Sequence, residues 1–356
     1  MSSGASLSRI DGAKPLTSAP PRHGRIPCWT KPQPQGLAPK KRWRKLNGER
    51  HLVGIMERII KPPKLHPGDL VGILSPAGPV EEAELEYGRY LLERSGFRVH
   101  LCEHVFDRRR YLAGEDRDRL ADLNGMLLNP DIKAVFCARG GYGTLRILDR
   151  IRYDLLTSNP KILLGFSDIT ALLMAVFSRT GLITFHGPVL RALPKGEMEN
   201  WDRIYRVLTA DKPLRVALEN GKTLVKGRSR GRLVGGNLSL ICHLTGTPFM
   251  PPLENGILFL EDTNEPIYRI DRMLTHLKLS GCLKGLTGLL FGEFTRCGNP
   301  FERERLFLET AAALNIPSAT GFPVGHGRKN WTIPLGLMAT LDTETGTLSL
   351  PEAGVA

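Results

Sequence analysis

The sequence lacks the features that mark membrane-spanning, disulfide-rich and metal-binding chains. No uncharged apolar run approaches the ~18 residues that a transmembrane helix needs. The N-terminus has no apolar segment typical of a secretory signal. The six cysteines are scattered, without a C-x-x-C pair or a metal-ligand spacing. These absences favour a reducing compartment, so we expect a cytoplasmic protein.

Net charge is also scarce once the first 55 residues are set aside. The chain carries +13 in total, and residues 1–55 account for +9 of it, which leaves +4 for the remainder. A basic arm could bind nucleic acid or a membrane, but the single cluster KKRWRK contains one aromatic and is weak evidence for either. We therefore expect neither partner, and keep a non-enzymatic nucleotide- or nucleic-acid-binding protein as a distant alternative.

The composition along the 356 residues predicts two folded domains behind a tail. Seven prolines precede Pro62, periodicity is weak there, and Met56 begins the first ordered-looking stretch, so an upstream mis-assigned start is expected. The predicted boundaries are a disordered basic tail at 1–60, an N-terminal α/β domain at 61–195, a linker at 196–230 and a β-rich C-terminal domain at 231–356.

The N-terminal domain reads as an alternation of strands and helices. The strand-like segments DLVGILSP, FRVHLCE, IKAVFCA, KILLGF and LITFHGP are separated by segments with helical spacing, of which the third is TLRILDRI. This alternation predicts a parallel, Rossmann-like sheet covered on both faces, with functional sites at the carboxyl ends of its strands. The C-terminal domain shows strand-like segments and one amphipathic helix around RIDRMLTHLKLSG. The predicted class is therefore α/β with a second, smaller β-rich domain.

Ser167 lies where a predicted strand turns into a predicted helix. In ILLGFSDITALL, the turn would lift a hydroxyl above the sheet edge and direct helix N–H groups at the same point. The usual elbow is G-x-S-x-G, and Ile169 replaces its last glycine. Taken alone, this segment is explained better if Ser167 or Asp168 caps the helix.

The loop RGGYG follows the predicted strand IKAVFCA, and it strengthens the case for a catalytic site at Ser167. Its glycines permit positive φ and close backbone approach to a ligand. It lacks the spacing of a dinucleotide loop and the lysine of a P-loop. An oxyanion donor from Gly141 is at least as good an interpretation as a phosphate site.

The C-terminal domain offers residues that could activate a serine. Glu261 and Asp262 end an apolar strand, and His326 lies between glycines in a loop, where it has no apolar face to fill. His186, at the end of another strand, is a second candidate base. Ser167, His326 and Glu261 would supply a nucleophile, a base and an orienting carboxylate.

Seven blocks, taken together, resemble the LD-carboxypeptidase family of serine peptidases, which also includes microcin C immunity peptidases. The resemblance runs in order from about Leu65 to about Leu350. The blocks are SPAGPV, ARGGYGTLRILDRIRYD, NPKILLGFSDITALL, TFHGPVL, GGNLSLICHLTGTP, LFLEDTNEPIYRIDRML and FPVGHGRKNWTIPLG.

The resemblance implies a Ser167–His326–Glu261 triad between an α/β domain and a smaller β-rich domain. It also implies an oxyanion hole from the backbone N–H groups of Gly141 and Asp168, which would leave the Asp168 side chain to cap its helix. It implies no metal or cofactor, and often a homodimer.

The implied activity releases the terminal D-alanine of murein tetrapeptides during cell-wall recycling. Because such a substrate ends in a carboxylate, we expect Arg139, Gly140 or Arg269 to contact it, although Arg269 could equally be an ordinary surface charge. The alternative within the family is an immunity-type peptidase that cleaves peptidyl or aminoacyl adenylate conjugates, which a stacking aromatic would favour. Trp331 is the one tryptophan near the site loops, and core packing is its simpler explanation.

Overall fold

The computed structural model describes residues 59–193, 195–196 and 198–356. The predicted tail up to residue 58 and the predicted start at Met56 lie outside these residues. Within the described ranges, no helix combines the length and the apolar character needed to cross a bilayer.

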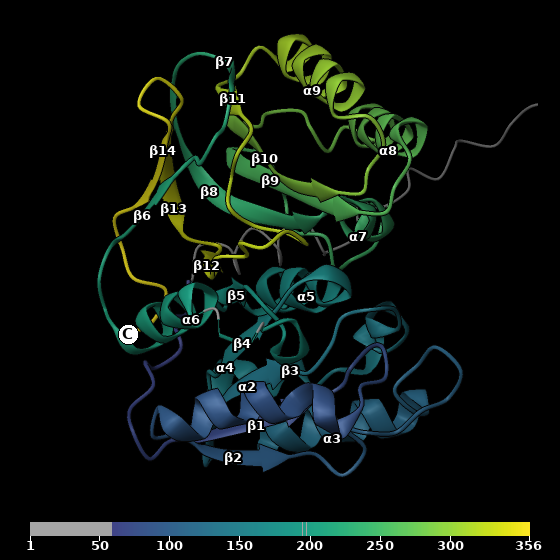
Figure 1. Ribbon diagram of the computed structural model, residues 1–356, viewed down its shortest axis with the longest axis vertical. Coiled ribbons are helices and arrows are strands. Elements are labelled where there is room, and N and C mark those ends of the chain that lie inside the picture. Colours follow the sequence, from purple (N-terminus) through teal and green to yellow (C-terminus); the bar gives the residue numbers. More distant parts are fainter. Residues whose placement is uncertain (1–58, 194, 197) are drawn as a thin grey trace, which may run out of the picture. The chain divides into compact units, whose positions relative to one another are not determined.

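The first sheet has six strands in the order β12-β5-β4-β3-β1-β2, and five of them are parallel (Figure 1). The β3 and β4 strands are apolar along almost their whole length and are buried, as expected for central strands covered on both faces. The prediction of a parallel α/β sheet is confirmed. Its parallel strands are β1 (Leu70–Leu74), β2 (Arg98–Leu101), β3 (Ile132–Cys137), β4 (Ile162–Gly165) and β5 (Thr184–His186).

Helices follow these strands as predicted, except that one of the predicted helices is not formed. The segment TLRILDRI forms two 3₁₀ turns, η1 (Thr144–Arg146) and η2 (Leu148–Arg150), instead of one helix. The regular helices of this half are α2 (Glu82–Arg94), α3 (Asp116–Leu128), α4 (Tyr153–Ser158) and α5 (Thr170–Thr180). Because β3 pairs directly with β4, the glycine-rich loop and the serine turn leave the sheet side by side.

The second sheet has eight strands in the order β6-β14-β13-β8-β9-β10-β11-β7. Its centre is parallel: β8 (Arg228–Asn237), β9 (Gly256–Thr263), β10 (Gly288–Thr295) and β11 (Ser318–Ala319). Antiparallel strands flank it: β6 (Leu214–Ala217), β7 (Thr223–Val225), β13 (Met338–Asp342) and β14 (Thr347–Leu350).

The second half is more helical than the sequence pattern indicated. It contains α8 (Ile267–Leu279), which was expected, and also α7 (Leu238–Leu244) and α9 (Pro300–Leu314), which were not. The α7 helix lies in RLVGGNLSLICHLTGTP, which the sequence pattern predicts to be strand-like, and the Asn237 side chain caps it by accepting from the Leu240 N–H over 3.2 Å. The same device, Asn299 followed by Pro300, begins α9.

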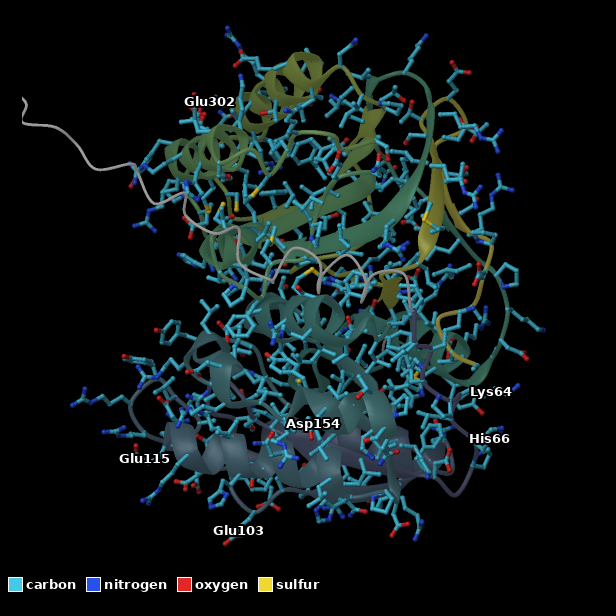
Figure 2. All side chains as sticks on the ribbon, turned by 180° about the vertical axis from the view of Figure 1, so that it is seen from behind. Lys64, His66, Glu103, Glu115, Asp154 and Glu302 are labelled. Atoms are coloured by element: carbon cyan, nitrogen blue, oxygen red, sulfur yellow. The ribbon has the colours of Figure 1, made fainter. Side chains whose placement is uncertain are left out.

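Two segments join the halves of the chain. The stretch 196–230, expected to be a linker, contains α6 (Glu199–Thr209), β6 and β7. Farther along, β12 (Ile333–Leu335) leaves the second half and pairs antiparallel with β5 of the first sheet. The buried apolar side chains of both halves form one continuous cluster, while charged side chains such as Glu103 and Glu302 lie on the outside (Figure 2).

Candidate active site

Ser167 lies at the turn between β4 and α5, in a strained backbone conformation. Its φ of 63° falls in the left-handed region that non-glycine residues rarely adopt. It lies inside the 3₁₀ turn η3 (Ser167–Ile169), which leads into α5, whereas the cap positions of η3 and α5 are Phe166 and Ile169. The capping explanation for Ser167 is therefore wrong.

Two crowded glycines permit this turn. A Cβ on Gly165 would lie 2.7 Å from the Ile169 side chain, so the isoleucine that replaces the usual second glycine packs over the first one. A Cβ on Gly140 would lie 2.8 Å from the Ser167 Cβ and 3.0 Å from its Oγ. The glycine-rich loop therefore approaches the serine so closely that position 140 has no room for a side chain.

Asp168 fixes the glycine-rich loop to the serine turn. Its buried Oδ2 accepts from the Thr144 N–H over 2.8 Å and from the Thr144 hydroxyl over 2.6 Å. Burial raises the pKa of Asp168, and these hydrogen bonds oppose the rise. The expectation that this side chain caps its own helix is wrong, because the carboxylate caps the turn that follows RGGYG.

The backbone N–H groups of Gly141 and Asp168 remain available near the serine. Gly141 has a φ of 104°, and within the described residues its N–H donates no backbone hydrogen bond. Asp168 is the second residue of η3, where an N–H has no partner inside the helix. These groups can stabilise an oxygen anion that forms beside Ser167.

Glu261 and His326 form a close pair in the second half of the chain. The His326 Nδ1 lies 2.8 Å from the Glu261 Oε2. Glu261 lies near the carboxyl end of β9 and its side chain is fully buried, whereas the His326 side chain is 20% exposed. With Nδ1 donating to the carboxylate, Nε2 is left as an acceptor that can take a proton.

The electrostatics of this pair favour a protonatable histidine. Burial raises the pKa of Glu261, and its hydrogen bond with His326 works against that rise. Burial lowers the pKa of His326, but the hydrogen bond and charge of Glu261 outweigh it, so the pKa lies above its ordinary value of 6.5. Glu261 therefore stabilises the imidazolium that proton transfer would create.

The pair lies beside the serine turn. The ring centroid of His326 is 4.7 Å from that of Phe166, the residue before Ser167. Among the described residues, Ser167 and His326 form no direct hydrogen bond. Such bonds are often long until substrate binds.

The carboxyl end of β8 positions Glu261 relative to the serine helix. The Asn237 N–H donates to the Thr170 hydroxyl of α5 over 3.1 Å, and Asn237 pairs with Glu261 across the sheet. Asp262, next to Glu261, accepts from the Asn237 amide and from the Ser239 N–H and hydroxyl. Asp262 is thus structural, and sequence reasoning missed Asn237, which GGN at the strand end could have signalled.

His186 supports the histidine loop and is a poor candidate for a base. It is completely buried, and burial lowers its pKa to about 3. Its Nε2 lies 3.2 Å from the Asn330 Oδ1, which also accepts from the Gly325 N–H over 3.1 Å. Asn330 thereby connects the end of β5 to the loop of His326.

The predicted carboxylate-binding residues differ in environment. Arg139 is half-buried and donates to the Pro79 carbonyl, and burial lowers its pKa. The carbonyl of Gly140 accepts from the Gly78 N–H over 2.9 Å. Arg269 is exposed on α8 and forms an ion pair with Glu265 at 3.4 Å, as a surface charge would.

Exposed aromatic rings lie in and beside the glycine-rich loop. Tyr142 follows Gly141 and is 46% exposed, and its ring meets that of Tyr111, which is 60% exposed, at 5.6 Å in an edge-on arrangement. Trp331, by contrast, is buried and donates from Nε1 to Glu199 over 3.2 Å. Core packing is therefore the explanation for Trp331, whereas the tyrosines are free to stack on a ligand.

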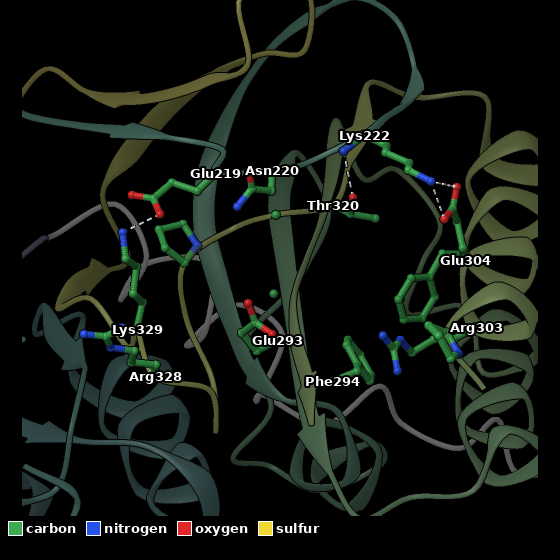
Figure 3. A pocket seen from close by; sticks show the side chains of 15 residues that line it. Glu219, Asn220, Lys222, Glu293, Phe294, Arg303, Glu304, Thr320, Arg328 and Lys329 are labelled. Atoms are coloured by element: carbon green, nitrogen blue, oxygen red, sulfur yellow. Dashed lines mark hydrogen bonds and ion pairs between the residues drawn. The ribbon is translucent and has the colours of Figure 1, made fainter. Parts of the chain in front are cut away.

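A cavity of about 450 Å³ adjoins the loop that carries His326. Figure 3 shows Glu293 of β10 and Arg303 of α9 pointing into it. Ion pairs occupy two parts of its rim, Lys222 with Glu304 and Lys329 with Glu219. The cavity lies at the carboxyl ends of β10 and β11 and can accept a group that carries both a carboxylate and an ammonium.

Across the described ranges, His104, Asp107 and Asp118 are the cluster whose donor atoms could surround a metal ion. The His104 Nδ1 is already engaged by Asp122 over 2.9 Å. The cluster shares no residue with the serine, histidine and glutamate described above.

Two family models match most of the described chain. They are the LD-carboxypeptidase N-terminal domain, over residues 71–187, and the LD-carboxypeptidase C-terminal domain, over residues 230–341. The chain belongs to the LD-carboxypeptidase family, as the sequence blocks predicted.

The chain is similar to members of this family, and to one solved structure, over nearly their whole lengths. A Streptomyces coelicolor protein named as a carboxypeptidase is 40% identical, over 83% of this chain and 97% of the relative. The murein tetrapeptide carboxypeptidase of Pseudomonas aeruginosa is 37% identical, over 76% and 92%. The structure of MccF, the Escherichia coli microcin C7 self-immunity protein, with glutamyl sulfamoyl guanosine superposes with a TM-score of 0.77 at 25% identity, covering 83% of this chain and 99% of MccF.

Proposed function

We propose that this protein is a serine LD-carboxypeptidase that releases D-alanine from murein tetrapeptides. The hydrogen bond between His326 and Glu261, beside a serine held at positive φ, is the observation that carries the proposal. A relative with this activity in its name supports the choice of substrate. The distant alternative of a nucleic-acid-binding protein has no comparable support.

In the proposed reaction, His326 Nε2 takes the proton of the Ser167 hydroxyl as Oγ attacks the carbonyl carbon before the terminal D-alanine. The N–H groups of Gly141 and Asp168 stabilise the oxygen anion that forms. His326 then gives its proton to the leaving amine, which frees D-alanine and leaves an acyl-enzyme. Water, deprotonated by His326, attacks the acyl-enzyme and releases the shortened peptide.

Charged groups around the site suit an ionised peptide. Arg139, in the glycine-rich loop, is the cation that would bind the terminal carboxylate. Glu293 and Arg303 line the cavity beside the His326 loop and could contact charged groups elsewhere on the peptide.

The decisive experiment offers purified protein a murein tetrapeptide ending in D-alanine and its all-L counterpart, and measures released alanine. Wild type should release alanine from the first peptide only, and Ser167→Ala should abolish release. Ser158→Ala, an exposed serine at the end of α4, is the matched control and should retain full activity. Equal release by wild type and Ser167→Ala would exclude Ser167 as the nucleophile.

A second candidate is the cleavage of aminoacyl sulfamoyl nucleosides, the class of compound bound in the solved MccF structure. The exposed ring pair of Tyr111 and Tyr142 favours it, because such rings can stack on a nucleobase. If the protein leaves tetrapeptides intact but hydrolyses glutamyl sulfamoyl guanosine, this candidate replaces the first.

A cytoplasmic location and a homodimer also belong to the proposal. All five cysteines of the described residues are free thiols, which fits a reducing compartment. Cell fractionation tests the location, and light scattering of the purified protein tests the oligomeric state.

A further inference from the structure

A second cavity, of about 530 Å³, lies between α6, β6 and the segment after β14. This volume falls within the roughly 300–1,000 Å³ of small-molecule sites. Val207, Leu214 and Pro334 give it apolar walls. It shares no lining residue with the cavity beside the His326 loop.

Every charged side chain that lines this cavity is a cation. Arg203 and Arg206 come from α6, Lys212 from the turn that follows, and Arg215 from β6. Arg206, Lys212 and Arg215 are exposed, and none of the three forms an ion pair with a described residue. A concave surface with one sign of charge attracts counter-ions of the other sign.

The carboxylates around this cavity are already engaged elsewhere. Asp211 forms an ion pair with Lys64 at 3.1 Å (Lys64 is labelled in Figure 2). Glu199 accepts from the Trp331 ring over 3.2 Å and lies 3.4 Å from Lys329. Within the described residues, Arg206, Lys212 and Arg215 therefore have no carboxylate in an ion pair, whereas the charges of Glu199 and Glu219 partly offset that of Arg203.

The guanidinium groups of α6 also repel one another. Burial lowers the pKa of Arg203, and the positive charge of Arg206 lowers it further. Arg203 cannot move away easily, because its guanidinium stacks on the Trp331 ring at 3.7 Å from the centroid. A bound anion would relieve this repulsion.

We infer that the cavity of Arg203, Arg206, Lys212 and Arg215 binds a phosphate-bearing small molecule, independently of the proposed peptidase activity. Three arginines can bind phosphate oxygens in bidentate fashion, and a phosphate dianion matches the excess of positive charge. The volume and the apolar walls leave room for an organic group, such as a pentose, attached to the phosphate. The site lies on the helix that also holds the histidine loop, since Asn200 of α6 donates to the Arg328 carbonyl over 3.0 Å.

Titration calorimetry with inorganic phosphate and with ribose 5-phosphate tests this inference on the full chain. We expect both to bind, with ribose 5-phosphate binding more tightly if the organic group enters the cavity and equally if only the phosphate is held. The double variant Arg206→Gln/Arg215→Gln should weaken binding at least about tenfold, because two charge-assisted contacts are lost.

The double variant Lys226→Gln/Lys284→Gln removes two exposed cations elsewhere and is the matched control for charge. It should bind both probes as wild type does. The inference is overturned if wild type binds neither probe at millimolar concentration, or if the two double variants bind equally. Thermal melting confirms that both variants fold, which is expected because all four side chains are exposed.

Discussion

The His326 ring donates from Nδ1 to the Glu261 Oε2 over 2.8 Å, across 65 residues of sequence. The two residues come from different segments of the second half: Glu261 from the carboxyl end of β9, and His326 from the loop between β11 and β12. A Cβ on Gly325 would lie 3.0 Å from the Glu261 Oε2, so the glycine before the histidine is what allows the approach.

Replacement of Glu261 by glutamine should leave the protein folded but nearly inactive. The amide keeps the shape of the carboxylate but cannot stabilise the imidazolium, so we expect kcat/KM for D-alanine release to fall by about 10³–10⁴-fold. Glu254→Gln, at an exposed position, should retain wild-type activity. Activity within a few-fold of wild type in Glu261→Gln would show that Glu261 does not orient the base.

The pH dependence of kcat/KM should report the raised pKa of His326. Only the neutral ring can accept the serine proton, so activity should rise with pH and reach half its plateau above pH 6.5. In Glu261→Gln, the residual activity should reach half-plateau at lower pH, because the charge that raises the pKa is gone. An unchanged midpoint in the variant would contradict this assignment.

The raised pKa of His326 should also make the free energy of unfolding depend on pH. A group whose pKa is higher in the folded state contributes stability that is fully present below its unfolded pKa, near 6.5, and that is lost as pH rises through its folded pKa. His326→Gln should therefore flatten this part of the dependence of unfolding free energy on pH, which urea titrations at several pH values measure.

Glycine should be tolerated better than alanine at position 167. Because Ser167 has a φ of 63°, Ser167→Gly should be more stable than Ser167→Ala by about 1 kcal/mol, although both should be inactive. At Ser178, inside α5, the order should reverse, with glycine less stable than alanine by about 1 kcal/mol. Urea unfolding of the four variants measures both differences, and the same order at both positions would refute strain at Ser167.

Asp168 and Thr144 should be energetically coupled, so that substitutions at the two positions do not have additive effects on stability. Thr144→Val and Asp168→Asn should each cost about 1–3 kcal/mol of unfolding free energy, and the double variant should cost clearly less than the sum. The exposed pair of Thr275 and Asp271 on α8, at 3.2 Å, is the control and should show coupling near zero. Additive losses at Asp168 and Thr144 would mean that the carboxylate does not hold the loop.

Local patterns predicted the first sheet and its serine turn, because strand and helix periods alternate there without interruption. The extra helices of the second half were missed, although Asn237 and the Asn299–Pro300 pair are cap signals that the sequence contains. Local propensity could not predict the antiparallel pairing of β12 with β5, since its partners are far apart in the chain.

The candidate site was predictable by residue type more than by geometry. Gly165 and Ser167 suggested an elbow, yet the role of Asp168 as an anchor for Thr144 depends on the pairing of β3 with β4. The distance between His326 and Glu261 depends likewise on how the loop after β11 crosses the sheet. Such relationships follow from tertiary packing, which sequence spacing does not encode.

The pairing of β12 with β5 also governs how this protein is made. Ile333 and Leu335 lie opposite His186 and Thr184, so the sheet that carries the serine turn is completed only when almost the whole chain has left the ribosome. A nascent chain that ends before β12 exposes an unpaired, apolar strand edge, which is a template for aggregation. Cells that truncate or stall this chain near its end should therefore accumulate insoluble fragments rather than a partly active enzyme.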